Sequence, residues 1–238
     1  IPVLEKNGMK VGQDFYLSFA PERTVEGNAL QELRSLPQII GGYDRESCEM
    51  TARLFSCLTN TIVEVESLEA AEMVKLLNNT YRDLVFSFAN EVSKICDSFN
   101  LNSFKLLESA NEGYPRNPIP MPSPGVGGIC LAKDPFLYTK AYGNSSNYNP
   151  ILGVASRTIN SNGHLDVLAK IEKFCLKIGK SLDSIQIFLI GLAFKGVPET
   201  SDIRESVSLK LLQTLPVKTN IRIKDFVVAD EIIVSTGC

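Results

Sequence analysis

The sequence has 238 residues but only one histidine, His164, and its six cysteines form no C-x-x-C pair. A single histidine excludes most metal sites and most catalytic triads of the Ser–His or Cys–His kind. The wide and irregular spacing of the cysteines indicates neither a zinc site nor a disulfide framework. We therefore expect no bound metal and a reducing, cytoplasmic compartment.

Charge and hydrophobicity exclude two further kinds of partner. The formal net charge is −3, which provides no electrostatic attraction to nucleic acid. No apolar run approaches the ~18–20 residues of a membrane span, so we expect neither nucleic acid nor a membrane as a partner. With 44% hydrophobic and 21% charged residues, the composition is that of a globular protein with one or two cores.

The pattern of apolar residues in the first half of the chain predicts an α/β fold. A strand over 15–20, an apolar run over 38–44, a helix over 45–58 and a strand over 61–66 are typical of the end of a Rossmann-like sheet. Residues 67–98 then carry a helical stripe of about eight turns, which predicts a long central helix and a homodimer core.

The second half of the chain predicts a partial Rossmann-like domain. A continuous apolar strand is followed by a polar turn and a helix, which is the first step of a doubly wound sheet. The expected elements are helices over 101–112, 164–180 and 203–215, strands over 184–194, 220–226 and 229–235, and a polar loop over 142–150.

The segment PSPGVGGICLAKDPF (122–136) places three glycines directly before Cys130. Glycine accepts positive φ and lets the backbone approach another group, so this loop is built for shape. A proline-rich stretch precedes it rather than a strand, so its glycines are not a dinucleotide fingerprint. Cys130 is either a small buried apolar residue or a nucleophile that the loop presents.

Four pairs of polar residues are candidates for chemistry: Glu22 with Glu26, Lys75 with Asn79, Cys130 with Asp134, and Lys195 with Arg204. Taken singly, each pair has an ordinary explanation. Glutamates near a strand end are usually solvated, a Lys–Asn pair usually lies on a helix surface, and a lone cysteine is usually an apolar core residue. Lys75 and Asn79 nevertheless project from one helix face near the apolar stripe.

Taken together, four blocks of the sequence resemble the UDP-glucose/GDP-mannose dehydrogenase family. In chain order they are SFAPERTVEGNAL, EAAEMVKLLNNTYRDLVFSFANEV, PGVGGICLAKDP and GLAFKGVPETSDIRES. The resemblance covers the chain up to about residue 215. The run YPR followed by PGVGG is more similar to the branch that oxidises UDP-N-acetylmannosamine or UDP-N-acetylglucosamine at C6 than to the UDP-glucose branch.

The resemblance implies three domains. We expect a remnant of an NAD-binding Rossmann domain over 1–66, a central helical dimerisation domain with the cysteine loop over 67–160, and a partial UDP-sugar-binding domain over 161–238. The glycine-rich fingerprint for NAD does not occur in the sequence, so most of the first domain is expected to be missing. The homodimer is expected to form through the 67–98 helix.

The resemblance also implies a mechanism, in which a C6 alcohol is oxidised to a carboxylate in two NAD-dependent steps. Cys130 matches the nucleophile that carries a thioester intermediate. Lys75 and Asn79 match residues that stabilise the developing oxyanion. Asp134 matches the residue that orders the attacking water, and Glu22 matches the residue assigned to thioester hydrolysis.

Residues for binding follow from the same resemblance. The residues implied at the UDP-sugar are Glu26, Arg116, Gly125, Gly127, Phe194 and Lys195, and those implied at NAD are Glu26 and Arg204. The predicted activity is that of a UDP-N-acetyl-D-mannosamine 6-dehydrogenase. UDP-glucose and GDP-mannose are the alternative substrates.

Two other functions remain open at this point. A thiol hydrolase or acyl transferase that uses Cys130 would need His164 as its base. A chain with an incomplete NAD domain would instead be a fragment that binds a nucleotide sugar or dimerises without catalysis.

Overall fold

The computed structural model describes residues 1–141, 150–216 and 218–236. The chain divides into two compact units, Ile1–Asn78 and Asn79–Cys238. Most of the predicted polar loop over 142–150 lies outside the described residues.

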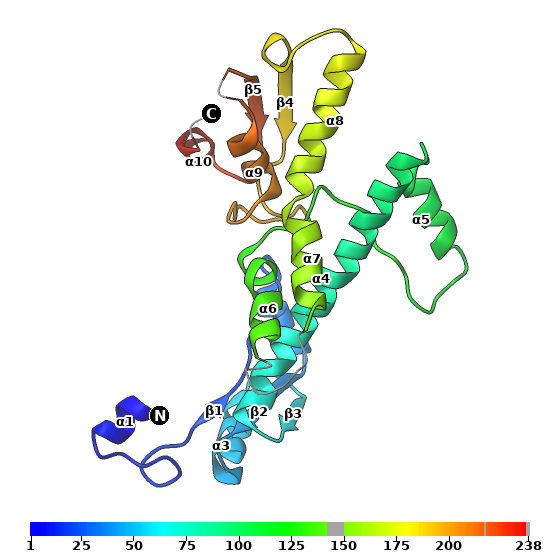
Figure 1. The fold of residues 1–238 in the computed structure, drawn as a ribbon. Coiled ribbons are helices and arrows are strands. Elements are labelled where there is room, and N and C mark those ends of the chain that lie inside the picture. Colours follow the sequence, from blue (N-terminus) through cyan, green and yellow to red (C-terminus); the bar gives the residue numbers. More distant parts are fainter. Residues whose placement is uncertain (142–149, 217, 237–238) are drawn as a thin grey trace. The chain divides into compact units, whose positions relative to one another are not determined.

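The first unit is built on a three-stranded sheet with the order β1-β2-β3 (Figure 1). Its outer strand β1 pairs antiparallel with β2, and β2 pairs parallel with β3. A crossover helix joins the two parallel strands, as a parallel pair requires. The elements are α1 (Pro2–Lys6), β1 (Ser18–Phe19), α2 (Ala29–Ser35), β2 (Gln38–Gly42), the crossover helix α3 (Arg45–Phe55) and β3 (Ile62–Val65).

This sheet confirms the predicted strand–helix–strand pattern of a Rossmann-like α/β fold. Ile39 and Ile40 of the central strand are 7% and 0% exposed, so β2 supplies the core of the unit. The short helices α1 and α2 were not predicted. Neither buries a residue, and a helix without an apolar face gives no periodic signal in the sequence.

The predicted long helix is confirmed as α4 (Leu68–Ser98), which has 31 residues and is therefore ~46 Å long. The Ser67 hydroxyl accepts a hydrogen bond from the backbone N–H of Ala70 at 3.1 Å and so caps its first turn. The helix α5 (Ser103–Asn111) follows, and the hydroxyls of Ser93 and Ser103 lie 3.3 Å apart. Within the described ranges, no helix has both the length and the apolar character that crossing a membrane requires.

The second unit combines helices with a two-stranded parallel sheet, β4-β5 (Figure 1). A small core of four buried residues, Leu192, Leu212, Val228 and Ile233, packs beside this sheet. Besides part of α4 and α5, its elements are α6 (Ile129–Lys140), α7 (Leu152–Ser161), α8 (Gly163–Lys177), a 3-10 turn (Leu182–Ser184), β4 (Gln186–Ile190), α9 (Val207–Thr214), β5 (Asn220–Lys224) and α10 (Asp230–Ser235).

Two predictions in this unit were wrong in part, and one region had no predicted element. The segment 229–235 forms the helix α10 rather than a strand, because Ile233 packs into the core while two acidic residues occupy the first helical turn. The predicted buried strand exposes Phe188 and Ile190, at 60% and 62%, on one face of β4. Residues 135–160, for which no element was predicted, contain the second half of α6 and all of α7 except its last residue.

Candidate active site

Glu22, in the first unit, follows β1 and faces a lysine of α4. The Glu22 Oε2 lies 3.6 Å from the Lys75 Nζ, and the Glu22 Oε1 accepts hydrogen bonds from the backbone N–H and the hydroxyl of Thr24. Burial alone would raise the pKa of Glu22, but the Thr24 hydrogen bonds and the Lys75 cation outweigh it and lower this pKa. Glu22 is therefore an anion near neutral pH, beside a half-buried cation.

Asn79 of α4 and Asp134 of α6 meet within the second unit. The Asn79 Nδ2 donates a hydrogen bond to the Asp134 Oδ2 at 2.6 Å. Asp134 is only 1% exposed, and its other oxygen pairs with the Lys133 ammonium. These partners offset the cost of burying a carboxylate. Because Asn79 lies one helical turn after Lys75, the two side chains project from the same face of α4.

Cys130 lies in the first turn of α6, whereas the sequence analysis placed it in a glycine-rich loop and predicted no helix there. The thiol is exposed, and Asp134 follows one helical turn later. Gly128 caps the helix with a φ of 86°, and a Cβ on it would lie 2.8 Å from the Phe194 ring. Only glycine therefore allows the ring to cover this turn. The amides of the helix start would stabilise negative charge that develops on the sulfur.

Phe194 and Lys195 lie beside the glycine loop. A Cβ on Gly127 would lie 2.5 Å from the Glu205 carbonyl oxygen and 3.2 Å from the Phe194 Cβ, so the two segments pack closely. The Lys195 Nζ lies 5.6 Å from the centroid of the Phe194 ring, within cation–π range. The structure thus packs Phe194 against the glycine loop that precedes Cys130, more than sixty positions earlier in the sequence.

A cavity of about 340 Å³ opens at the carboxyl ends of β4 and β5, lined by Ile190, Lys195, Thr200, Asp225 and Phe226 among others. In open α/β sheets, ligands bind outside the carboxyl ends of the strands. The cavity carries both polar groups and apolar walls, which suits a small polar ligand with a ring.

Asp225 holds the two strand ends of this cavity together. Its Oδ2 accepts hydrogen bonds from the N–H groups of Leu192 and Ala193 at 2.6 and 3.2 Å. Its Oδ1 accepts from Val227 and Val228 at 2.8 and 2.9 Å. Burial alone would raise the pKa of Asp225, but these four donors lower it to about 2.

The remaining predicted binding residues are exposed. The Arg116 guanidinium lies 5.3 Å from the centroid of the Tyr114 ring. Arg204 grips both carboxylate oxygens of Asp202 at 2.6 to 2.9 Å, and these hydrogen bonds lower the pKa of Asp202. Glu26 lies in the turn that follows β1.

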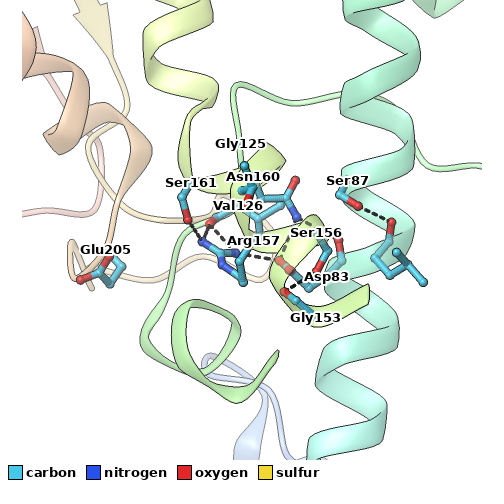
Figure 2. Close-up of polar contacts among 12 residues, drawn as sticks. Asp83, Ser87, Gly125, Val126, Gly153, Ser156, Arg157, Asn160, Ser161 and Glu205 are labelled. Atoms are coloured by element: carbon cyan, nitrogen blue, oxygen red, sulfur yellow. Dashed lines mark hydrogen bonds and ion pairs between the residues drawn. The ribbon is translucent and has the colours of Figure 1, made fainter. Parts of the chain in front are cut away.

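The sequence pattern missed a buried polar cluster between α4 and α7 (Figure 2). The Arg157 Nη1 donates to the Asp83 Oδ1 at 2.7 Å, and these residues are 1% and 0% exposed. The Asn160 Nδ2 donates to the same oxygen at 2.8 Å. The spacing in the sequence could have indicated these residues. Arg157 and Asn160 lie three positions apart on one helix, and Asp83 lies one turn after Asn79, so each pair shares a helix face.

His164, which the alternative thiol chemistry requires, lies at the start of α8. In the part of the chain that the structure describes, no hydrogen bond joins it to Cys130, and its Nδ1 is buried without a partner. The described ranges also contain no group of three or more His, Cys, Asp or Glu side chains placed to hold a metal ion.

The fold and these side chains define an α/β protein that contains one long helix, with a candidate active site that presents a thiol. Residues 69–162 match the UDP-glucose/GDP-mannose dehydrogenase family, central domain. The resemblance predicted from the sequence is therefore confirmed over this part of the chain.

Curated relatives and a solved structure agree with this assignment. The chain is 34% identical over 205 residues to a UDP-N-acetyl-D-mannosamine dehydrogenase of Methanococcus maripaludis, which covers 86% of this chain and 46% of the relative. It is 36% identical over 199 residues to a UDP-N-acetyl-D-mannosamine dehydrogenase of Campylobacter jejuni. This alignment covers 84% of this chain and 46% of that relative. The solved UDP-D-ManNAc dehydrogenase of Pyrococcus horikoshii superposes with a TM-score of 0.86 at 31% identity, covering 96% of this chain and 53% of that structure. The chain thus spans about half the length of the relatives it matches.

Proposed function

We propose that this chain forms part of an NAD-dependent nucleotide-sugar 6-dehydrogenase, with a UDP-N-acetylhexosamine, foremost UDP-N-acetyl-D-mannosamine, as substrate. The observation that supports it most is the thiol of Cys130, exposed at the start of α6, one turn before the buried Asp134–Asn79 contact. This arrangement lies inside the segment that matches the family. The names of the relatives support the choice of sugar.

Cys130 would act as the covalent nucleophile. NAD, when bound, would supply the hydride acceptor, with one NAD+ consumed in each of the two oxidations at the C6 carbon of the sugar. Between the two transfers, the thiolate adds to the aldehyde carbon and forms a thiohemiacetal, which the second oxidation converts to a thioester. Water then displaces the sulfur, so that a carboxylate leaves and the thiol is restored.

The charged and polar neighbours would assist these steps. Lys75 offers a positive charge and Asn79 a neutral donor from one face of α4, which suits an oxyanion on C6. Asp134, held in place by Asn79, would orient the attacking water. Glu22 is an anion near neutral pH and would accept the proton of that water.

The binding groups of this chain fit both ligands. The exposed guanidinium of Arg204, held by Asp202, suits the pyrophosphate of NAD, and Glu26 would lie between nicotinamide and sugar. The cavity at the ends of β4 and β5, with Lys195 at its wall, would take the nucleotide of the substrate. Arg116 would add a charge to its phosphates, and the backbone of Gly125 and Gly127 would line its path.

We further propose the three domains 1–66, 67–160 and 161–238, and a homodimer through the 67–98 helix in a cytoplasmic setting. Large apolar side chains are exposed along the helix at 48% to 69%, namely Leu77, Tyr81, Phe88 and Ile95. Exposed apolar stripes of this kind are typical of surfaces that bind another protein.

The test is NADH formation by the intact protein with a panel of UDP- and GDP-linked sugars. We expect two NADH per uronate formed with one or more UDP-N-acetylhexosamines. The Cys130→Ser variant should bind substrate but lose turnover, because a serine hydroxyl is far less ionised than a thiol. Cys57→Ser is the matched control, since Cys57 is also exposed and should be dispensable. No NADH with any sugar, or full activity in Cys130→Ser, would contradict the proposal.

A further inference from the structure

The helices α4 and α7 enclose an ion pair that has almost no access to solvent. Arg157 and Asp83 are 1% and 0% exposed, and their nearest atoms are 2.7 Å apart. Within the described residues, the Arg157 Nε and the Asp83 Oδ2 have no hydrogen-bond partner. A buried ion pair that is incompletely bonded contributes little stability compared with apolar residues of the same volume. Its contacts with the glycine loop indicate another role.

Arg157 forms hydrogen bonds to the backbone of the loop that leads to Cys130 (Figure 2). Its two terminal nitrogens donate to the Val126 carbonyl oxygen at 3.4 and 3.3 Å. The Val126 N–H donates in turn to the carbonyl oxygen of Asn160 at 3.3 Å. Both polar groups of one loop residue are therefore held by α7.

The loop lies directly on α7, because glycine leaves room for this contact. Gly125 has a φ of 126°, and a Cβ there would lie 2.5 Å from the Asn160 carbonyl oxygen. A second tie lies at Ser123, whose N–H donates to the Asn90 Oδ1 at 2.7 Å, while the Asn90 Nδ2 donates to the Asn160 Oδ1 at 2.9 Å. The buried cluster thus holds the loop at two points before the helix begins.

Only three residues separate Val126 from Cys130, and two of them are also confined. Gly127 packs against the Glu205 backbone, and Gly128 packs under the Phe194 ring. With Gly127 and Gly128 confined in this way, a displacement of Val126 would pass into the first turn of α6 and move the Cys130 thiol.

We propose that Arg157, oriented by Asp83, is a positioning residue that fixes the Val126 carbonyl and thereby the place of the Cys130 sulfur. This role rests on the proposed function for its catalytic consequence, but the placement of the sulfur is measurable without any turnover. The guanidinium is required for its fork of parallel donors, which a lysine ammonium does not reproduce.

Two variants of the intact protein test the proposal. Arg157→Lys keeps the charge but loses the fork. The double variant Asp83→Leu/Arg157→Met replaces the ion pair with apolar groups, a change that buried pairs often tolerate without loss of stability. Both variants remove the pair of hydrogen bonds from Arg157 to the Val126 carbonyl oxygen. If Arg157→Lys does not fold, the double variant still decides the test.

The primary readout is the rate of iodoacetamide alkylation at Cys130, resolved by peptide mass spectrometry and divided by the rate at Cys57 in the same sample. Cys57 is exposed and lies after α3, so it serves as an internal reference. We expect this ratio to fall severalfold in both variants, because a frayed helix start no longer stabilises the reacting thiolate. In turnover with the UDP-sugar, kcat should fall at least about tenfold while KM changes little.

The matched control is Asp166→Asn, which removes the exposed ion pair between Asp166 and Lys94 of α4, 2.8 Å apart. It should leave the alkylation ratio and kcat unchanged. Folded Arg157 variants with an unchanged ratio, even if their melting temperature is lower, would overturn the positioning role and leave a structural one. If the protein oxidises no nucleotide sugar at all, the proposed function fails, and the alkylation ratio still decides the positioning role.

Discussion

Replacing Asp225 by asparagine tests a carboxylate whose pKa is lowered by four backbone N–H donors. Each of its oxygens accepts two backbone N–H groups, one pair from the end of β4 and one from the end of β5. An asparagine has a single acceptor oxygen, so it would satisfy one pair and turn an NH₂ group toward the other. The variant therefore loses hydrogen bonds and leaves buried donors unpaired.

The magnitude follows from the protonation equilibrium. The pKa of Asp225 is lowered from 3.8 to about 2. At ~1.36 kcal/mol for each factor of ten in that equilibrium, the ionised carboxylate stabilises the folded sheet by about 2 kcal/mol. Local unfolding at the carboxyl ends of β4 and β5 should therefore become about 30-fold more frequent in Asp225→Asn.

Hydrogen exchange followed by mass spectrometry measures this opening in peptides that contain Leu192 and Val228. Asp230→Asn, on the exposed first turn of α10, is the control and should exchange like the parent. Because the folded-state pKa is the lower one, the stabilisation is complete above the ordinary value of 3.8 and is lost as the pH falls toward 2. Unchanged exchange in Asp225→Asn, or the same loss of protection between pH 4 and 2 in that variant, would refute the reasoning.

Two further predictions concern the glycine cap and the long helix. Gly128→Ala should lower stability by about 1–3 kcal/mol in thermal unfolding, because its Cβ meets the Phe194 ring at positive φ. Gly179→Ala, also at positive φ but with open space around it, should cost less, and equal effects would contradict the packing argument. Light scattering at micromolar concentration should give twice the mass of one chain, and Phe88→Asp on the exposed stripe of α4 should shift it to the monomer. A monomeric parent protein would end the dimer proposal.

The long helix and the first sheet were predictable because their apolar residues repeat at the period of one element. The stripe from Leu68 onward gives α4, and the alternating β-branched run over 61–66 gives β3. The helix α6 was not predictable in this way, because Pro135 lies inside it and its apolar residues form no single face.

The candidate site was only partly predictable for a different reason. Cys130 and Asp134 are neighbours in the sequence, so their relation could be read there. The contact between Asn79 and Asp134 joins residues 55 positions apart, and no local pattern encodes it. The same holds for Arg157 and Asp83, 74 positions apart, which meet only after α7 has packed on α4.

The most direct test of the central claim is mass spectrometry of the Glu22→Gln variant of the intact protein after incubation with a UDP-N-acetylhexosamine and NAD. Glutamine cannot accept the proton of the attacking water, so the thioester should form and hydrolyse slowly. We expect a covalent acyl adduct on the Cys130 peptide, and none when Cys130→Ser is added to the variant. A Glu22→Gln protein that has lost turnover but carries no adduct on Cys130 would contradict the account.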